Sequence, residues 1–574
     1  MFRINDEHLQ GRLFTVIDDL PATAKKRLAN SWAPIFYNYF FTRIDESVFA
    51  ELYSNKYSRP NTPVNILIGF ETLKSGFGFS DEELYDNFLF NLQFRYALGL
   101  HEIDEGYFNL RTIYNFRSAL YRFEQDTGRN LIKEATSEIT DEQIEQLQIK
   151  TGIQRMDSTQ IQTNIRNMSR IQLLVEIIQR VYRILTESDQ KKLNEYFADY
   201  IKEDSLHYCY RIKRNEAMSR LEGIGKVMAA LVEELEEEYH SDEAYKHLKR
   251  VFFEHFKVED SHRIQIKEGK ELSGQTLQSP DDPEATYRRK QNESSKGYVA
   301  NITETCDPEN NIQLITEVNV KPNTTDDQEL FKEDIERLKQ RTEIKKIWTD
   351  GGYCGETAAE AAKENEVIHR TTAIKGRSKD ENKIGLDDFT IEMDNDHIPK
   401  KMTCPNKQEG DIKRGRKVHR YSAGFDAGKC ESCPLKNQCP TKILKKKPIR
   451  ILRFSSKELR VALQRRIIKE QGKEGNIRAA VESTIRSVIH PFGGHRCKMP
   501  VRGKFRISCM IILSAMMVNI RRLTEYALKN GLKFLVDLYR LTGSIHLIDI
   551  CCLNACKDLS YSVPLNKHSP LCLA

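Results

Sequence analysis

The chain has 574 residues, too many for one ordinary hydrophobic core, so we expect two to four domains or one domain with large insertions. Its 89 basic and 83 acidic residues leave a net charge of only +6, which does not by itself require a polyanionic partner. Thirteen cysteines in so long a chain do not fit a secreted disulfide framework, and the first residues lack the apolar segment of a signal peptide. We therefore expect a reduced, cytosolic setting.

Apolar residues at helical spacing predict three short helices in the first quarter of the chain. One covers Pro63 to Leu73, the next begins at Ser80, which forms a capping-box pattern with Glu83, and the third covers Thr112 to Phe123. We expect a helical N-terminal DNA-binding domain, residues 1–145, that docks on phosphates. A plain helical bundle with a solvated basic face explains the same pattern equally well. The basic residues concerned are Arg95, Arg111, Arg117 and Arg122.

A long helical region from Ser169 to about Phe256 interrupts a series of strand-like segments. A further helix, Asp326 to Arg341, precedes a strand that ends at Asp350 and a glycine turn. Because strands alternate with helices, the order predicts an α/β or α+β core, with a helical insertion at about residues 168–260. The expected strands are Ile153 to Ile161, Arg263 to Ile266, Gly297 to Thr303, Ile312 to Val320 and the segment before Asp350.

A second insertion, about residues 376–455, contains four cysteines and runs into a basic tract. Between Lys436 and Lys473, thirteen lysines or arginines stand against two glutamates. This tract is the best candidate for a surface that binds DNA phosphates, although a long exposed helix can carry such charge without a ligand. The expected contacts are Lys445, Lys446, Lys447, Arg450 and Arg453.

The C-terminal part contains an apolar stretch from Ile507 to Ile520, within a helix expected over Phe505 to Leu523. The stretch is shorter than the roughly 20 residues that cross a bilayer, so it predicts a buried helix and no membrane role. Residues 531–574 are expected to form a C-terminal tail.

The cysteines of the second insertion have a spacing compatible with structural zinc. Cys430 and Cys433 form a close chelating pair, Cys439 follows, and Cys404 lies upstream, with His419 as a substitute ligand. Four thiolates would close a zinc site, so a structural role is expected and a catalytic one is not. Reduced cysteines without metal are the alternative.

Three carboxylates, Asp157, Asp350 and Glu482, stand out by their sequence context. Two-metal phosphoryl transfer needs several hard oxygen ligands around ions about 4 Å apart, and Asp and Glu are the usual suppliers. Each residue also has an ordinary interpretation: Asp157 as a cap, Asp350 as the start of an Asp-Gly turn, and Glu482 as the ion-pair partner of a neighbouring arginine. Taken singly, they favour the ordinary interpretation.

Taken together and in order, three segments resemble the bacterial insertion-sequence transposases, whose catalytic core is ribonuclease-H-like. These segments are Asp157-Ser-Thr-Gln-Ile161, Thr349-Asp-Gly-Gly-Tyr353 and Ala480-Val-Glu482, and the resemblance covers roughly Pro60 to Leu523. It implies a catalytic domain over residues 146–530 with a ribonuclease-H-like mixed sheet, preceded by an N-terminal helical transposase domain. It also implies a DDE transposase that cuts and joins the DNA ends of a mobile element.

The resemblance implies further properties of the site. Asp157, Asp350 and Glu482 would bind two Mg²⁺ or Mn²⁺ ions, and Arg478 would contact DNA, whereas Gly475 and Ile489 stand where many relatives have Tyr and Lys. The implied partners are double-stranded DNA, both terminal repeats and target, and further copies of the chain, in the bacterial cytoplasm at the nucleoid. A catalytically inactive, transposase-derived DNA-binding protein is the main alternative, and another ribonuclease-H-like nuclease is the second.

Overall fold

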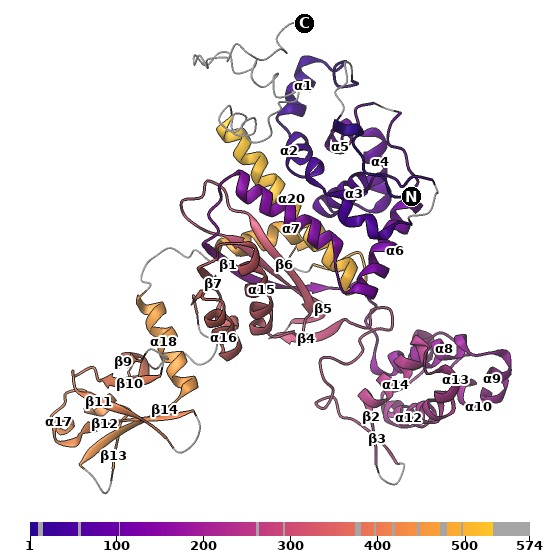
Figure 1. Cartoon of the computed structure of the whole chain (residues 1–574). Coiled ribbons are helices and arrows are strands. Elements are labelled where there is room, and N and C mark those ends of the chain that lie inside the picture. Colours follow the sequence, from indigo (N-terminus) through magenta and orange to yellow (C-terminus); the bar gives the residue numbers. More distant parts are fainter. Residues whose placement is uncertain are drawn as a thin grey trace, which may run out of the picture.

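A central body carries two lobes in the computed structural model (Figure 1). One lobe is helical and follows the first strand of the central sheet, and the other is mostly strands and follows the last. The structure describes residues 1–9, 15–54, 59–102, 104–259, 263–290, 293–373, 380, 382–394, 398–415, 419–444, 448–470, 479–494 and 497–531.

The first part of the chain is helical, as predicted. The predicted helices are α3 (Val64–Phe77), α4 (Asp81–Phe90) and α6 (Leu110–Thr127), and the Ser80–Glu83 capping box is present at the start of α4. Gly78 ends α3 in the left-handed region, with φ +75°, which favours glycine. The predicted helix that begins at Ser80 is divided into α4 and α5 (Leu92–Ala97). The elements not predicted are η1 (Glu7–Leu9), α1 (Ala22–Ala29), α2 (Trp32–Tyr39), η2 (Phe41–Arg43), η3 (Glu46–Leu52) and α7 (Leu131–Gln146).

A six-stranded mixed sheet forms the centre of the body, which confirms the α/β fold class. Along the sheet the order is β6–β5–β1–β7–β8: β5 runs antiparallel to β1 and β6, while β7 runs parallel to β1 and β8. β4 forms a hairpin with the first residues of β5. The strands are β1 (Ile153–Gln162), β4 (Thr286–Lys290), β5 (Glu293–Thr305), β6 (Ile315–Pro322), β7 (Lys346–Thr349) and β8 (Ile368–Thr371).

Helices cover both faces of this sheet. α15 (Asp327–Arg341) and α16 (Glu356–Glu364) pack on the face that carries Met156. α19 (Ala479–Ile489) and α20 (Lys504–Asn530) pack on the face that carries Ile302, together with the N-terminal helices. Strand alternation sends neighbouring residues of β1 to opposite faces, so Met156 and Asp157 point to different sets of helices.

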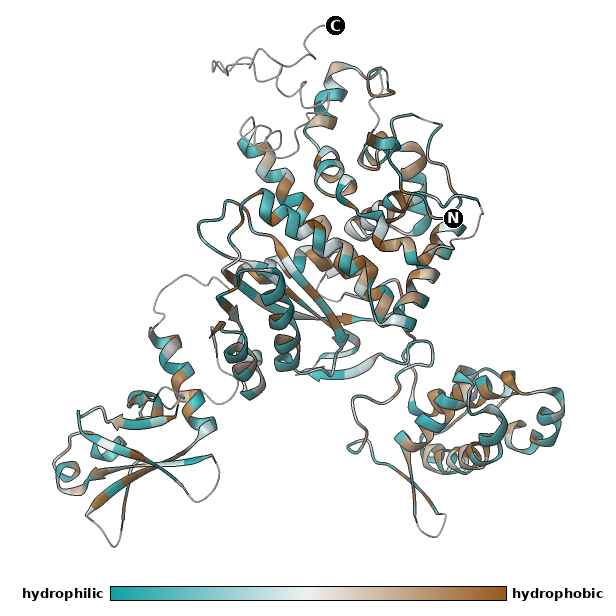
Figure 2. Ribbon diagram, in the orientation of Figure 1, coloured by the Kyte–Doolittle hydropathy of each residue, from teal (hydrophilic) through white to brown (hydrophobic). Residues whose placement is uncertain are grey.

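α20 contains the predicted apolar stretch and is buried. Among the described helices it alone is long and apolar enough to cross a membrane, but 89% of its apolar window lies inside the fold, as in the core helix of a soluble protein. The Asn519 side chain donates to the carbonyl of Ile315 (3.0 Å) and accepts from its N–H (2.8 Å). This pairing satisfies backbone groups of β6 with a side chain of the helix. Figure 2 shows hydrophobic residues gathered on the central strands and on α20.

The helical lobe has a hydrophobic core of its own. The Ser169 hydroxyl accepts from the Gln172 N–H, as the predicted cap requires. The predicted strand Arg263 to Ile266 forms as β3, but it pairs with β2 in this lobe and not with the central sheet. The elements are α8 (Arg170–Ile184), α9 (Glu187–Lys192), α10 (Asn194–Phe197), α11 (Ser205–Tyr210), η4 (Arg214–Glu216), α12 (Ala217–Glu234), α13 (Glu236–Tyr239), α14 (Glu243–His255), β2 (Phe256–Val258) and β3 (Ile264–Ile266).

The second lobe, here called the β lobe (residues 386–470), is built on another six-stranded sheet with the order β13–β14–β12–β11–β10–β9. It contains the four cysteines and most of the basic tract. Its elements are η6 (Leu386–Asp388), β9 (Thr390–Met393), β10 (Pro399–Thr403), β11 (Glu409–Arg414), β12 (Arg420–Asp426), α17 (Ala427–Glu431), η7 (Lys436–Gln438), β13 (Lys442–Ile443), β14 (Ile449–Ser455) and α18 (Ser456–Glu470). The 3₁₀ turns η5 (Gly351–Tyr353) and η8 (His490–Phe492) belong to the central body.

Candidate active site

Asp157 and Asp350 lie on neighbouring parallel strands. Arg155 of β1 pairs in register with Trp348 of β7, and Asp157 and Asp350 each lie two residues further along their own segment. Asp350 directly follows β7 and keeps extended backbone angles, φ −81° and ψ 177°, so the strand direction continues through it. Adjacent strands are about 4.8 Å apart, and residues in register point to the same face. Asp157 and Asp350 therefore belong to the same end of two adjacent strands.

Backbone N–H groups hold both carboxylates. Asp157 Oδ1 accepts from the N–H of Ser158 at 2.8 Å, and Asp350 Oδ1 accepts from the N–H of Gly352 at 2.7 Å. The second bond caps the turn η5, which begins as soon as the strand ends. The Gly351-Gly352 pair thus fixes the orientation of Asp350 as well as turning the chain.

Asp327, the first residue of α15, adds a carboxylate that the sequence analysis did not single out. A Cβ atom on Gly352 would stand 2.7 Å from Asp327 Oδ2 and 2.9 Å from Asp350 Oδ1, so the two carboxylates flank the same glycine. The Ser158 hydroxyl also donates to Asp327 Oδ1, at 3.4 Å. The Asp326-Asp327 pair was the available signal, but acidic residues at a helix start are typical of ordinary capping.

The phenol of Tyr353 lies beneath this group of carboxylates and donates to Asn301 Oδ1 at 2.5 Å. Burial raises the pKa of Tyr353 well above its usual value, and the negative charges of Asp157, Asp327 and Asp350 raise it further. The phenol therefore stays protonated and able to donate.

Glu482 lies on the exposed side of α19. That helix packs against β1 and β5. Asp157 is directly opposite Ile302 on β5, and Ile302 shares a hydrophobic core with Ile485 and Val488 of α19. The helix that carries Glu482 thus covers the face of the sheet to which Asp157 belongs. Arg478 lies outside the described residues.

The oxygen ligands of this region suit a hard divalent cation in kind. Within the described part of the chain, no three His, Cys, Asp or Glu side chains are close enough together to form a ready metal site. Carboxylate oxygens, such as those of Asp157, Asp327 and Asp350, are the kind of ligand that Mg²⁺ or Mn²⁺ takes.

The four cysteines of the β lobe line one pocket of about 450 Å³. Burial raises the pKa of the Cys430 thiol. The positive charge of Arg450 lowers this pKa, and the other three cysteines raise it further. The N–H of Gln408 donates to Cys404 Sγ at 3.3 Å, and the Cys430 thiol donates to Gln408 Oε1 at 3.4 Å. His419 follows the opposite end of β11 and does not line the pocket, so the prediction of a substitute ligand there is wrong.

The predicted DNA contacts of the basic tract have different environments. Arg453 is exposed on β14, whereas Arg450 donates to the Oγ1 (2.9 Å) and carbonyl (2.8 Å) of Thr441. On α18, Arg460 pairs with Glu356 of α16 at 3.1 Å. Part of the local positive charge is therefore balanced within the protein. Lys445, Lys446 and Lys447 lie outside the described residues.

Two of the four N-terminal arginines have internal partners, which corrects their expected role at phosphates. Arg95 is buried and donates to the carbonyls of Phe88 and Glu105. Arg117 pairs with Glu71 (2.7 Å) and Asp81 (2.6 Å). The remaining two, Arg111 and Arg122, are exposed on α6.

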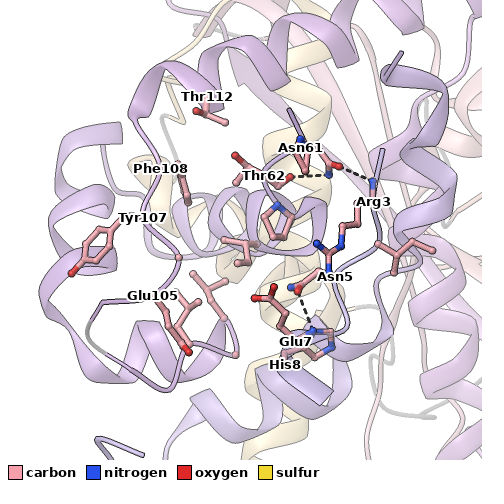
Figure 3. A pocket seen from close by; sticks show the side chains of 18 of the residues that line it. Arg3, Asn5, Glu7, His8, Asn61, Thr62, Glu105, Tyr107, Phe108 and Thr112 are labelled. Atoms are coloured by element: carbon pink, nitrogen blue, oxygen red, sulfur yellow. Dashed lines mark hydrogen bonds between the residues drawn. The ribbon is translucent and has the colours of Figure 1, made fainter. Parts of the chain in front are cut away.

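A cavity of about 980 Å³ lies in the N-terminal part of the chain, away from the candidate site (Figure 3). Its lining is polar and includes Arg3, Asn5, His8, Asn61 and Tyr107. None of the three predicted catalytic carboxylates lines it.

Two family models match the chain. One, described as "Transposase domain (DUF772)", matches residues 25–119, from α1 into α6. The other, "Transposase DDE domain", matches residues 403–524, from the β lobe into α20, and includes Glu482. Asp157 and Asp350 lie between the two matched segments. No curated protein and no solved structure matches the chain.

Proposed function

We propose that this chain is a DDE transposase of an insertion sequence, and that it cleaves and joins the DNA ends of a mobile element in a metal-dependent reaction. The observation that carries the proposal is the parallel pairing of β1 and β7, because it makes neighbours of the strand that carries Asp157 and the strand that leads into Asp350. The strand order, three antiparallel strands followed by two parallel ones, supports a ribonuclease-H-like core.

In this proposal Asp157, Asp350 and Glu482 hold two Mg²⁺ or Mn²⁺ ions. When bound, such ions lower the pKa of an attacking water and balance the charge that develops on the phosphate. The N–H groups of Ser158 and Gly352 keep the two aspartates oriented. The reaction hydrolyses the element end to release a 3′-hydroxyl, and that hydroxyl then attacks a target phosphodiester in line.

The partner is double-stranded DNA, bound by a homo-oligomer of this chain at the bacterial nucleoid. Residues 1–145 recognise the element ends through exposed groups of α6 such as Arg111 and Arg122. Arg453, Arg478 and the lysines at 445–447 contact the phosphate backbone, because lysine and arginine are the usual partners of DNA phosphates. The catalytic domain spans residues 146–530 with both lobes as insertions, and residues 531–574 form a tail.

A structural zinc ion in the β lobe completes the proposal. Cys404, Cys430, Cys433 and Cys439 line the same pocket, and four thiolates are a donor set that closes a zinc site.

The test separates cleavage from binding. The full chain is incubated with a labelled duplex that carries both ends of its element, with Mg²⁺ or Mn²⁺. Asp350→Ala removes a metal ligand and no cationic phosphate contact, so strand cleavage should fall more than about 100-fold, beyond the loss typical of residues that merely support a ligand. Binding to the ends should be unchanged in a gel-shift titration.

Asp199→Ala, at an exposed aspartate of the helical lobe, is the matched control and should keep both activities. Wild-type protein that binds the ends but cleaves with neither metal would favour the alternative, a DNA-binding protein derived from a transposase. Loss of binding together with cleavage in Asp350→Ala would indicate damage to the fold.

A further inference from the structure

We infer that Glu304 is a positioning residue that holds α19, and with it Glu482, against the strand that carries Asp157. The inference rests on the proposed function. Glu304 lies on β5 with a fully buried side chain. Its carboxylate joins three other elements: Oε1 accepts from Arg155 of β1 (2.7 Å), and Oε2 accepts from Thr484 of α19 (2.7 Å) and Arg522 of α20 (2.8 Å).

The partners of Glu304 stand next to two of the proposed metal ligands. Arg155 precedes Asp157 by two residues on β1, so both point to the same face of the sheet. The cross-strand neighbours on β5 follow the same order, with Glu304 opposite Arg155 and Ile302 opposite Asp157. Thr484 follows Glu482 by two residues on α19. One carboxylate thus ties the strand of the first ligand to the helix of the third.

The connection has little freedom to rearrange. Arg522 also donates to the Thr484 hydroxyl and, at 3.0 Å, to the carbonyl of Gln313. Trp348 lies in register with Arg155 on the other side of β1, and its indole is buried. A buried carboxylate between two arginines has a strong preference for one geometry, because any other leaves a buried charge without its partner.

A second buried glutamate gives a contrast within the same sheet. Glu317 of β6 pairs with Arg341 at 3.1 Å and also with Lys133 and Arg337. These partners belong to α7 and α15, not to α19. Glu304 and Glu317 are both buried and ion-paired. Glu304 differs from Glu317 because its partners include a residue of α19, the helix that carries Glu482.

The test removes only the hydroxyl that joins α19 to Glu304. Thr484→Val keeps the shape and the buried charges, and Thr484→Ser restores the hydroxyl. Mn²⁺ binding to the full chain is measured by electron paramagnetic resonance, alongside cleavage. Loss of the hydroxyl should weaken Mn²⁺ binding about 10–100-fold, the effect typical of groups that orient metal ligands. Thr484→Ser should recover most of it, and gel-shift binding to DNA ends without metal should not change.

Thr316→Val is the matched control, because the buried Thr316 hydroxyl donates to Gln154 of β1 at 2.6 Å and to the carbonyl of Thr303 of β5 at 3.3 Å. It should lower stability as Thr484→Val does and leave Mn²⁺ binding unchanged. Equal Mn²⁺ affinity in Thr484→Val and Thr316→Val would overturn the positioning role. Two results together would instead overturn the proposed function: the wild-type protein does not cleave, and Asp157→Asn and Asp350→Asn bind Mn²⁺ as tightly as the wild type does.

Discussion

Gly352 lies between two carboxylates, and its lack of a side chain leaves room for both. The first atom of any side chain would stand 2.7 Å from Asp327 and 2.9 Å from Asp350, closer than a carbon and an oxygen normally approach. The nearby backbone bond from Gly352 to Asp350 leaves that aspartate little freedom to move away. An added methyl group must therefore displace one of the carboxylates.

We predict that Gly352→Ala lowers the cleavage rate about 100-fold, because a displacement of about 1 Å in a reacting site can cost that much. Binding to element ends should persist. Gly152→Ala is a suitable control, since its new methyl group would meet only a carbonyl at 3.8 Å. Cleavage by Gly352→Ala at the wild-type rate would show that neither Asp327 nor Asp350 is held as tightly as these contacts indicate.

Individual residues also show what the sequence can and cannot reveal. Asp157 and Asp350 were noticed because their neighbours resemble family segments, whereas Asp327 looks like a helix cap. Arg117 looks like a phosphate contact until its partners, Glu71 and Asp81, come to it from two other helices. Whether a charged side chain is exposed or internally paired depends on tertiary neighbours that local sequence patterns do not contain.

α20 links separate parts of the molecule through three neighbouring polar side chains. Asn519 pairs with the backbone of β6, Arg521 donates to the Gly76 carbonyl of α3 at 2.5 Å, and Arg522 meets Glu304 of β5. The segment Val518 to Leu523 therefore joins α3 and the central sheet to one helix.

The crossing of α3 and α20 is tight at Gly76. A Cβ atom there would lie 2.6 Å from Met517 Cβ, which cannot swing away as the end of a side chain can. Helix propensity alone predicts that Gly76→Ala stabilises the protein by about 1 kcal/mol. Overpacking predicts a loss of about 1–3 kcal/mol. We expect the loss, measured as the free energy of unfolding in urea.

Gly223→Ala on α12 measures propensity alone, since nothing lies within 4 Å of its new methyl group. It should gain stability where Gly76→Ala loses it. A gain in both variants would mean that α3 and α20 do not approach as closely as described.

Many helices and strands of the central body were predicted from the sequence, but β4, β8 and α16 were not, nor was the pairing of the strands. Periodic apolar residues located α3, α6, α8 and α20, and strand-like segments located β5 and β6. β1 and β7 are separated by the whole helical lobe, so no local pattern indicates that they pair. The strands of the β lobe were missed because several, such as β11 with Glu409-Gly-Asp-Ile-Lys-Arg414, are mostly polar.

At the scale of the whole molecule, the helical lobe is an insertion between two strands of the central sheet, and the β lobe follows the last strand of that sheet. The helical lobe leaves after β1 and returns before β4, where Asp281 pairs with Arg180 of the lobe (2.6 Å) and with Arg502 of the body (3.1 Å). Its core includes residues from several helices. The β lobe has a much smaller core, so the two insertions differ in what can stabilise them.

Eight buried side chains form the hydrophobic core of the β lobe. A lobe with so few apolar residues is marginal unless a staple reinforces it, and a metal ion is one such staple. The four cysteines come from three places, the β10–β11 turn, α17 with its following turn, and the segment before β13, so one ion would tie these parts together. The core residues are Phe389, Ile391, Met402, Ala423, Phe425, Leu452, Phe454 and Leu459.

We therefore predict about one zinc per chain in protein purified without chelator, measured by elemental analysis. Removing the ion should expose the β lobe to limited proteolysis while the central body, with its own core, remains protected. Cys433→Ser should have the same effect, and Cys209→Ser, in the helical lobe, should not. Less than about half a zinc per chain in fully soluble protein, with the β lobe still resistant to protease, would favour reduced cysteines that only pack against the small core.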